Sequence, residues 1–235
     1  SVGPSRTADV RWWVTPAMGA GGSREAGLLY YAGGSLSYES EGEPWLVEIN
    51  PVAVAVKPIA RFEVDYFIPA QIFGADVATA RVEAPVPFHL GVRVRNVGYG
   101  SGLGVRMGTG QARVEISAAD RTMAYGIQAS EVNGGPASGG FAVSLGDIGP
   151  GRAGLARWVL ECPWSGSVAA FSANYSQTDG ANGRQVVAVD EVRTHALVWP
   201  VQVDLPGRDG VRDFLAGGGA ELKAYESEGL DTAVA

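Results

Sequence analysis

The residues of this chain that could do chemistry are few and lie far apart in the sequence. The two histidines, His89 and His195, each fall in a strand-like run. No HExxH or other close pair of histidines occurs, so the ligand spacing of a zinc site is missing from the sequence. No G-x-S-x-G elbow occurs either, although composition alone leaves a Ser-His-Asp triad open. We interpret both histidines as ordinary surface or core residues, and we expect no metal, no cofactor and no enzymatic activity.

Two groups of carboxylates could supply the acid pair of a glycoside hydrolase. They are Glu39, Glu41 and Glu43 in an expected hairpin loop, and Asp204, Asp209 and Asp213 near the end of the chain. The second group could offer oxygen ligands to Ca²⁺, but it lacks the dense D-x-D-x-D-G pattern of calcium loops. We interpret both groups as solvated turns.

The composition excludes several classes of partner. The net charge is −7 and lysine occurs only at Lys57 and Lys223, so no basic stripe is available for nucleic acid or anionic lipid. No run of about 18 apolar residues occurs, and we therefore expect no membrane insertion. With 235 residues, of which 46% are hydrophobic, the chain can bury a core without a metal or a disulfide. The single cysteine, Cys162, lies in an apolar run and is expected to be a buried small residue rather than a reactive thiol.

Short alternating runs separated by Gly and Pro predict an all-β protein. Phe88–Val97 is the clearest case, because its apolar residues at even positions predict one dry face and one wet face. The other expected strands are Asp9–Pro16, Leu28–Tyr38, Trp45–Ile49, Val52–Val56, Phe62–Ile68, Ala112–Ile116, Met123–Ala129, Phe141–Leu145, Ala153–Cys162, Val168–Gln177, Val186–Val189 and Val192–Val203. Strands at this spacing favour an antiparallel, immunoglobulin-like β-sandwich. Helix is expected only as one turn at Val211–Leu215 and as a short segment at Ala220–Glu228.

Three regions follow from this pattern. Residues 1–60 hold about four strands, too few for a closed sandwich, and form a small β module or the closing half of a preceding domain. Residues 61–203 are long enough for one complete sandwich. Residues 204–235 are rich in Gly and acidic side chains and are expected to be a tail or linker.

The order of turns in the central region resembles a known family. The strand from Pro87 ends in Asn96-Val97-Gly98, the turn Pro150-Gly151 follows about 50 residues later, and Trp158 lies on the next strand. Asn and Gly tolerate the left-handed backbone of a turn, Pro-Gly suits a type II turn, and Trp158 is a natural core residue. This order resembles the CARDB-type, immunoglobulin-like sandwiches repeated in large bacterial and algal cell-surface proteins. The resemblance implies a structural or adhesive segment with no shared catalytic residues.

A few further residues bear on partners. The resemblance implies an extracellular or cell-surface location and contacts with neighbouring modules or with copies of the same chain. Trp12, Trp13 and Trp45 are candidate ligand or interface aromatics, and they make a carbohydrate-binding module the alternative hypothesis. Asn174 begins the sequon Asn174-Tyr175-Ser176 and is a candidate glycosylation site.

Overall fold

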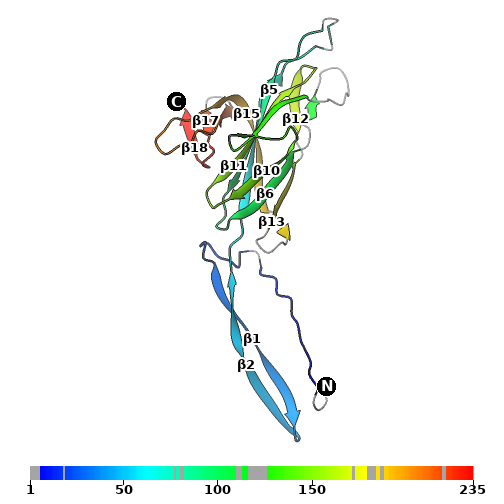
Figure 1. The fold of residues 1–235 in the computed structure, drawn as a ribbon, viewed down its shortest axis with the longest axis vertical. Helices are drawn as coiled ribbons and strands as arrows, with labels where there is room; N and C mark the ends of the chain where they lie inside the picture. Colours follow the sequence, from blue (N-terminus) through cyan, green and yellow to red (C-terminus); the bar gives the residue numbers. More distant parts are fainter. Residues whose placement is uncertain are drawn as a thin grey trace. The chain divides into compact units, whose positions relative to one another are not determined.

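The chain folds into strands joined by turns (Figure 1). The computed structural model describes residues 6–17, 19–76, 78–79, 82–109, 113–115, 126–170, 173–178, 184–185, 188–218 and 221–234. No helix occurs in these ranges, and the prediction of an all-β fold is confirmed. The chain divides into two compact units, Ser1–Pro58 and Ile59–Ala235.

The first unit contains one long antiparallel hairpin. Its strands are β1 (Leu28–Ser40) and β2 (Glu43–Val56). Glu41 and Gly42 join them with φ angles of 55° and 80°, and two successive positive φ values are typical of the type I′ turn that suits hairpin twist. The two strands expected at Trp45–Ile49 and Val52–Val56 are therefore halves of β2. The strand expected at Asp9–Pro16 is wrong, because that segment is not paired in a sheet.

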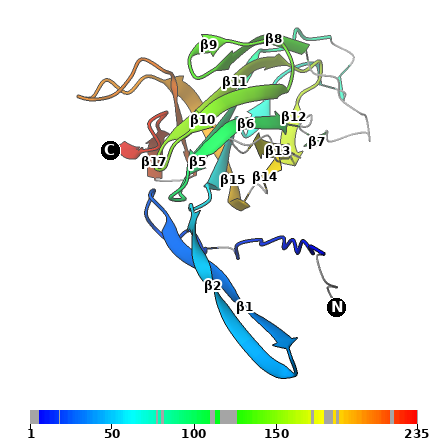
Figure 2. The ribbon, with the colours of Figure 1, turned by 60° about the horizontal axis from the view of Figure 1, so that its bottom comes forward.

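The second unit contains three sheets. A nine-stranded sheet has the order β18-β17-β16-β15-β3-β5-β11-β8-β9, a four-stranded sheet has the order β10-β6-β13-β14, and a three-stranded sheet has the order β4-β12-β7. Figure 2 shows β10 and β6 lying across the strands of the large sheet. The strands are β3 (Arg61–Ile68), β4 (Gln71–Ile72), β5 (Phe88–Asn96), β6 (Gly102–Thr109), β7 (Arg113–Glu115), β8 (Gly126–Val132), β9 (Gly135–Pro136), β10 (Ala142–Ile148), β11 (Ala153–Glu161), β12 (Gly166–Ala170), β13 (Ala173–Thr178), β14 (Arg184–Gln185), β15 (Ala188–Val201), β16 (Asp213–Gly218), β17 (Glu221–Tyr225) and β18 (Asp231–Val234).

The main core lies between the nine-stranded and the four-stranded sheets. The first sheet contributes alternate residues of β3, β5 and β11, and the second contributes residues of β6 and β10. On β5, Phe88, Leu90, Val92 and Val94 are all at most 6% exposed, so the predicted inward face of this strand is confirmed. Two layers that bury alternate side chains form the predicted sandwich.

One pair in the large sheet is parallel. β3 and β15 run in the same direction from Arg61↔Ala188 to Ile68↔Ala196, and the expectation of a purely antiparallel sandwich is wrong at this pair. Parallel neighbours need a long connection between them. Here the rest of the sandwich lies between the two strands in the sequence, so that requirement is met.

The outer face of the large sheet is covered near its middle. A second core cluster joins Phe67, Leu155 and Leu197 to Phe214 and Ala216 of β16. Gly91 makes this cover fit, because a Cβ there would lie 2.3 Å from Cε1 of Phe214. The outward side of β5 is therefore not the wet face that alternation predicted.

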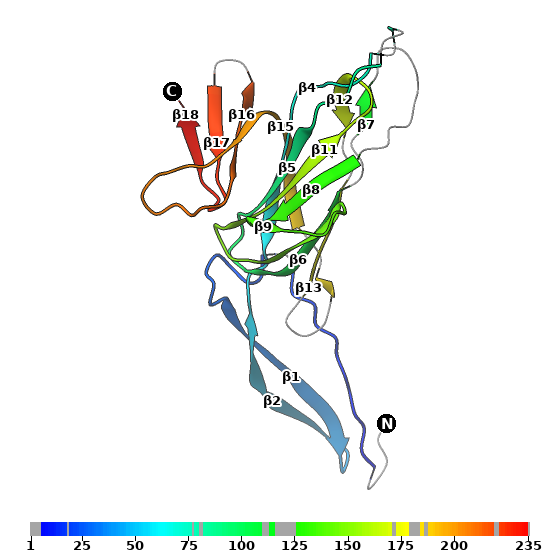
Figure 3. The ribbon, with the colours of Figure 1, turned by 45° about the horizontal axis from the view of Figure 1, so that its top comes forward.

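The covering strands come from the region expected to be a tail. Residues 204–235 contain β16, β17 and β18, which continue the large sheet beyond β15 (Figure 3). The helices expected at Val211–Leu215 and Ala220–Glu228 are wrong. Phe214 and Ala216 alternate as fully buried residues, and this period of two belongs to a strand rather than to a helix.

Candidate functional site

The most unusual surface of the molecule is one face of the β1–β2 hairpin, which we call the apolar hairpin face. Side chains that share a face are paired across the two strands. The face consists of Leu28, Tyr30, Ala32, Gly34, Leu36 and Tyr38 of β1, which pair with Val56, Val54, Val52, Ile49, Val47 and Trp45 of β2. Every one of these cross-strand pairs is apolar from the base of the hairpin almost to its turn.

A bulge keeps this face continuous. Along β2 the apolar residues change from even to odd positions between Val52 and Ile49, which in a regular strand would move them to opposite faces. The register shifts between Ala32 and Gly34, so that Asn50 and Pro51 together oppose Gly33. The extra residue restores the alternation, and proline suits a bulge because it has no N–H to donate.

The apolar hairpin face is open to solvent. Nine of its large side chains are between 42% and 67% exposed. Near the turn, the rings of Tyr38 and Trp45 stack with their centroids 6.5 Å apart. The opposite face is mixed: Ser35, Ser37 and Glu48 lie near the turn, and Leu29, Tyr31 and Leu46 are also exposed on it. The described residues of unit Ser1–Pro58 form no second layer over the apolar hairpin face.

The other candidate aromatics, Trp12 and Trp13, are also exposed, at 75% and 99%. The tip of the Trp12 ring lies beside Gly34, about where a side chain on that residue would point, at 3.9 Å. Gly34 is the one position of the apolar hairpin face without a side chain. Trp12 therefore touches the face at this notch and leaves most of it uncovered.

The turn residues singled out by the resemblance meet at one hydrogen-bonded junction. The buried Asn96 side chain donates to the carbonyls of Gly100 and Ile148 at 2.8 and 2.9 Å, and its Oδ1 accepts from the N–H of Gly98 at 3.0 Å. Gly151, which follows Pro150 and has a φ of 70°, donates to the carbonyl of Asn96. These groups line a shallow surface depression with Tyr99, and their bonds are satisfied within the protein.

Trp158 lies in the main core. Its ring is fully buried, and its indole Nε1 donates to the carbonyl of Gly140 at 2.9 Å. The buried indole thus has the polar partner that it needs. This residue stabilises the sandwich and offers nothing to a ligand.

His195 does meet a carboxylate. Its Nε2 lies 2.8 Å from Oδ1 of Asp65, and its Nδ1 lies 3.2 Å from the hydroxyl of Tyr225. Burial opposes the charge of Asp65, but the His195 hydrogen bond and Arg93 outweigh it and keep the pKa of Asp65 below its ordinary value. Burial, together with Asp65 and Asp231, raises the pKa of the Tyr225 hydroxyl, which makes that hydroxyl a poor nucleophile.

This cluster is a structural ion network. Arg93 is 1% exposed and forms ion pairs with Asp65 at 2.9 Å and with Asp231 at 2.5 Å. The network joins β3 and β5 to the start of β18. Because Asp65 and Arg93 are buried and paired, their charges hold the covering strands on the sheet rather than face a substrate.

His89 lies at the edge of a second small cluster. Its Nδ1 is 3.3 Å from the guanidinium of Arg157, and its ring meets Trp199 edge-on. Burial and the charges of Arg157 and Arg212 lower the pKa of His89, so its imidazole is neutral near pH 7.

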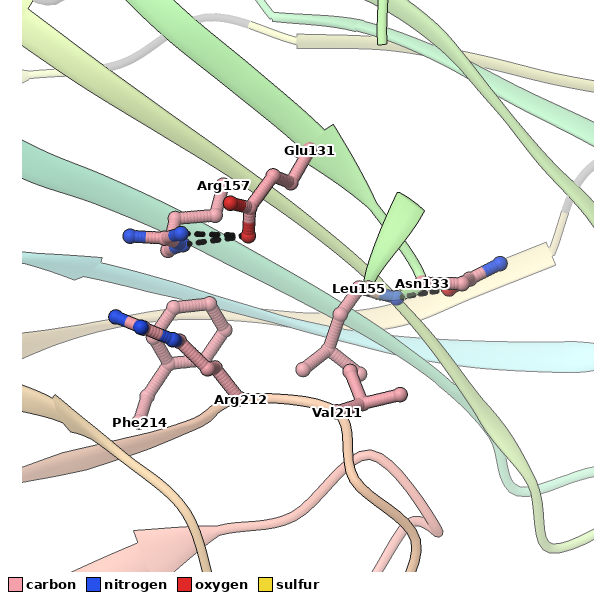
Figure 4. A pocket seen from close by; sticks show the side chains of 8 residues that line it. Glu131, Asn133, Leu155, Arg157, Val211, Arg212 and Phe214 are labelled. Atoms are coloured by element: carbon pink, nitrogen blue, oxygen red, sulfur yellow. Dashed lines mark hydrogen bonds and ion pairs between the residues drawn. The ribbon is translucent and has the colours of Figure 1, made fainter. Parts of the chain in front are cut away.

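A shallow pocket lies beside this cluster (Figure 4). Within it, Arg157 pairs with Glu131 at 2.5 Å, and Asn133 accepts the N–H of Leu155 at 2.8 Å. Val211 and Phe214 give the pocket an apolar wall. Its polar groups are thus largely committed to one another, and Glu131, whose charge acts on His89, is engaged by Arg157.

Two acids of the second carboxylate group, Asp209 and Asp213, bind groups of the protein itself, whereas Glu39 and Glu43 lie in β1 and β2 on either side of the turn at Glu41. Asp213 is buried and accepts the N–H groups of Val203 and Ser227, while Asp209 accepts from Val211 and Ser227. Among the residues that the structure describes, no group of three His, Cys, Asp or Glu side chains could hold a metal ion. Cys162 is fully buried and burial raises its thiol pKa, which favours the interpretation of a small core residue.

The glycosylation candidate Asn174 lies in β13 and is exposed. The next residue, Tyr175, points the other way and its hydroxyl is 2.9 Å from that of Tyr66. The sequon is therefore accessible at its first residue.

Two features of the site escaped the sequence analysis. The continuity of the apolar hairpin face depends on the bulge at Asn50-Pro51, whose only signal was the change from even to odd apolar positions. The pairing of Arg93 with Asp65 and Asp231 had no signal, because residues far apart in sequence form it.

Three comparisons with known proteins bear on the family of this chain. No family model, no curated protein and no solved structure matches the chain. Within the described residues, no helix has the length and apolar character needed to cross a membrane.

Proposed function

We propose that this chain is a non-catalytic structural or adhesive segment of a large extracellular or cell-surface protein, and that it makes protein–protein contacts through the apolar hairpin face. The observation that carries the proposal is the exposure of an unbroken apolar surface on a two-stranded ribbon. A lone two-stranded hairpin is marginally stable in water. A partner that covers the face would stabilise the hairpin and remove apolar surface from water at the same time.

The turn junction supports a CARDB-like relationship within this proposal. Asn96, Gly98 and Gly151, which carry the resemblance, are joined by hydrogen bonds at one junction, and Trp158 fills the core between the sheets. The state of the histidines supports the non-catalytic part. His195 is locked between Asp65 and Tyr225, and His89 is paired with an arginine.

Photo-crosslinking from two adjacent positions tests the proposal. Benzoylphenylalanine replaces either Leu36, on the apolar hairpin face, or Ser37, on the opposite face, in cells that produce the full-length protein. We expect protein adducts from position 36 and few from position 37. Equal yields at the two positions, or no adduct at position 36, would contradict a contact through this face.

The second candidate function is a carbohydrate-binding module, and the exposed Trp13 favours it. Against it, Trp45 stacks on Tyr38 beside the apolar pair Leu36 and Val47, and the turn pair Ser40 and Glu43 supplies the polar side chains next to it on the face. Glycan-array binding that disappears in Trp13→Ala would favour this alternative over a protein contact.

A further inference from the structure

The size of the apolar hairpin face indicates what kind of partner can cover it. Aromatic side chains have roughly 150–250 Å² of surface each and the aliphatic ones of this face somewhat less, so the exposed parts of the nine side chains sum to on the order of 800 Å². The largest apolar patch on an ordinary monomer is about 300–600 Å², whereas each side of a standard specific interface buries about 800 Å². The face therefore has the area of one complete side of a stable interface.

We propose that the partner is a second copy of this chain, whose apolar hairpin face packs on that of the first through a two-fold axis. The inference rests on the proposed function, because it requires the face to be a protein contact. The two hairpins would form a small four-stranded sandwich with its core between them. Each ribbon would then have the second layer that the hairpin lacks and that the strands of Ile59–Ala235 possess.

Self-association follows from the character of the face. Its paired positions contain no charged side chain before Glu43 at the turn, so two copies meet without like-charge repulsion although the chain carries −7 overall. A charged partner would find no opposite charge there to select it. A two-fold interface needs a surface that is complementary to itself, and an uncharged apolar face offers the same chemistry on both copies.

At its centre, the apolar hairpin face can accommodate the close approach of a second hairpin. Gly34 lies midway along β1, between Ala32 and Leu36, and leaves a notch that the Trp12 ring tip borders. Sheets pack about 10 Å apart, and small residues at the crossing point bring two layers together. Trp12 of each copy would lie at the margin of that crossing, where its exposed ring adds apolar area.

The first test is the mass of the purified 1–235 chain in solution. By sedimentation velocity at about 100 µM, we expect a dimer for the native sequence and for Ser37→Asp, and a monomer for Leu36→Asp. Burying an unpaired carboxylate in the interface should raise the dissociation constant at least about 100-fold. A monomeric native chain, or a dimer that Leu36→Asp leaves intact, would overturn the inference.

The second test needs no variant and so does not depend on how Leu36→Asp folds. Hydroxyl-radical labelling of the native chain should show that Leu36 and Trp45 become protected as concentration rises. Tyr31 and Leu46, which lie on the opposite face and are 67% and 68% exposed, should stay reactive. Protection that is independent of concentration would mean that the chain's own segment 9–16 covers the apolar hairpin face. That result would contradict the proposal that a second copy covers it.

The two proposals can fail separately. If photo-crosslinking from position 36 captures a different protein while the purified chain is monomeric, the proposed protein contact through the apolar hairpin face is supported and the proposed dimer is wrong. If position 36 captures nothing and the chain is monomeric, both fall.

Discussion

The hairpin of Ser1–Pro58 and the sandwich of Ile59–Ala235 use the same sequence pattern with opposite results. In β5, the alternate apolar residues Leu90 and Val92 are fully buried. In β1 and β2, the equally regular series that includes Leu36 and Val47 is about half exposed. The difference is the second layer, which Ile59–Ala235 supplies for its own sheet and which the described residues of Ser1–Pro58 do not supply for the hairpin. Alternation therefore defines a face, and the rest of the chain decides whether that face is covered from within.

The largest effect should come from truncating the same residue type in the two regions. Trp158→Ala should reduce the free energy of unfolding of the sandwich by about 3–5 kcal/mol, because it leaves a cavity in a closed core. Trp45→Ala, in the exposed ribbon, should change it by less than about 0.5 kcal/mol. Urea denaturation followed by circular dichroism measures both. Similar losses for the two variants would show that the hairpin and the sandwich unfold as one unit.

Ion pairs allow the same comparison within the sandwich. Arg93→Leu leaves the buried Asp65 without its guanidinium and should cost about 3 kcal/mol of unfolding free energy. Arg61, which is 57% exposed and pairs with Asp190 at 2.8 Å, is the matched control, and Arg61→Leu should cost less than about 1 kcal/mol. The denaturation midpoints of the two variants provide the measurement. A small effect of Arg93→Leu would mean that Asp65 gains enough from His195 and Arg193.

Acid should weaken the sandwich through Asp65. Its pKa is lowered in the folded state, so its ionised form contributes stability that is fully present above the unfolded value of about 3.9 and is lost as the pH falls through the folded pKa. We expect the stability difference between the native chain and Asp65→Asn to shrink as the pH falls below about 4. Thermal unfolding across pH 2–7 measures it. A difference that stays constant down to the lowest pH would exclude Asp65 as the titrating group.

Local chemistry was sufficient to predict much of this fold. The alternation in Phe88–Val97 predicts the buried side of β5, whereas neither Asn96 nor Gly98 has the left-handed backbone that their residue types suggest. Glu41 lies in the hairpin turn, as its place between two apolar runs indicates. These properties depend on neighbours in the sequence, and the sequence displays them directly.

The remainder depends on contacts between distant segments. The strands β16–β18 were not expected because Gly217 and its glycine neighbours suggest a linker, yet Phe214 finds a complementary site at Gly91 far away in the sequence. Asp9–Pro16 alternates like a strand but has no partner edge. A local sequence pattern does not show whether other strands will cover an apolar face. The candidate site is an apolar face that the described residues of its own unit leave uncovered.

The bulge in β2 offers the sharpest separation of the two regions, with the smallest effect on the sandwich. Inserting one alanine between Gly33 and Gly34 would give Asn50 a partner, remove the bulge and turn the half that contains Trp45 to the opposite side of the ribbon. Deleting Asn50 would also remove the bulge but keep Ile49 and Val52 on one side. The insertion should abolish self-association while the deletion preserves it, and neither should change the unfolding free energy of the sandwich by more than about 0.5 kcal/mol. Sedimentation and urea denaturation of the two variants measure both quantities. If both variants dimerise equally, the continuous apolar hairpin face does not join the two copies. The sandwich, whose sheet is covered by the chain itself, and the hairpin, whose face a second copy covers, would then no longer differ in the way proposed.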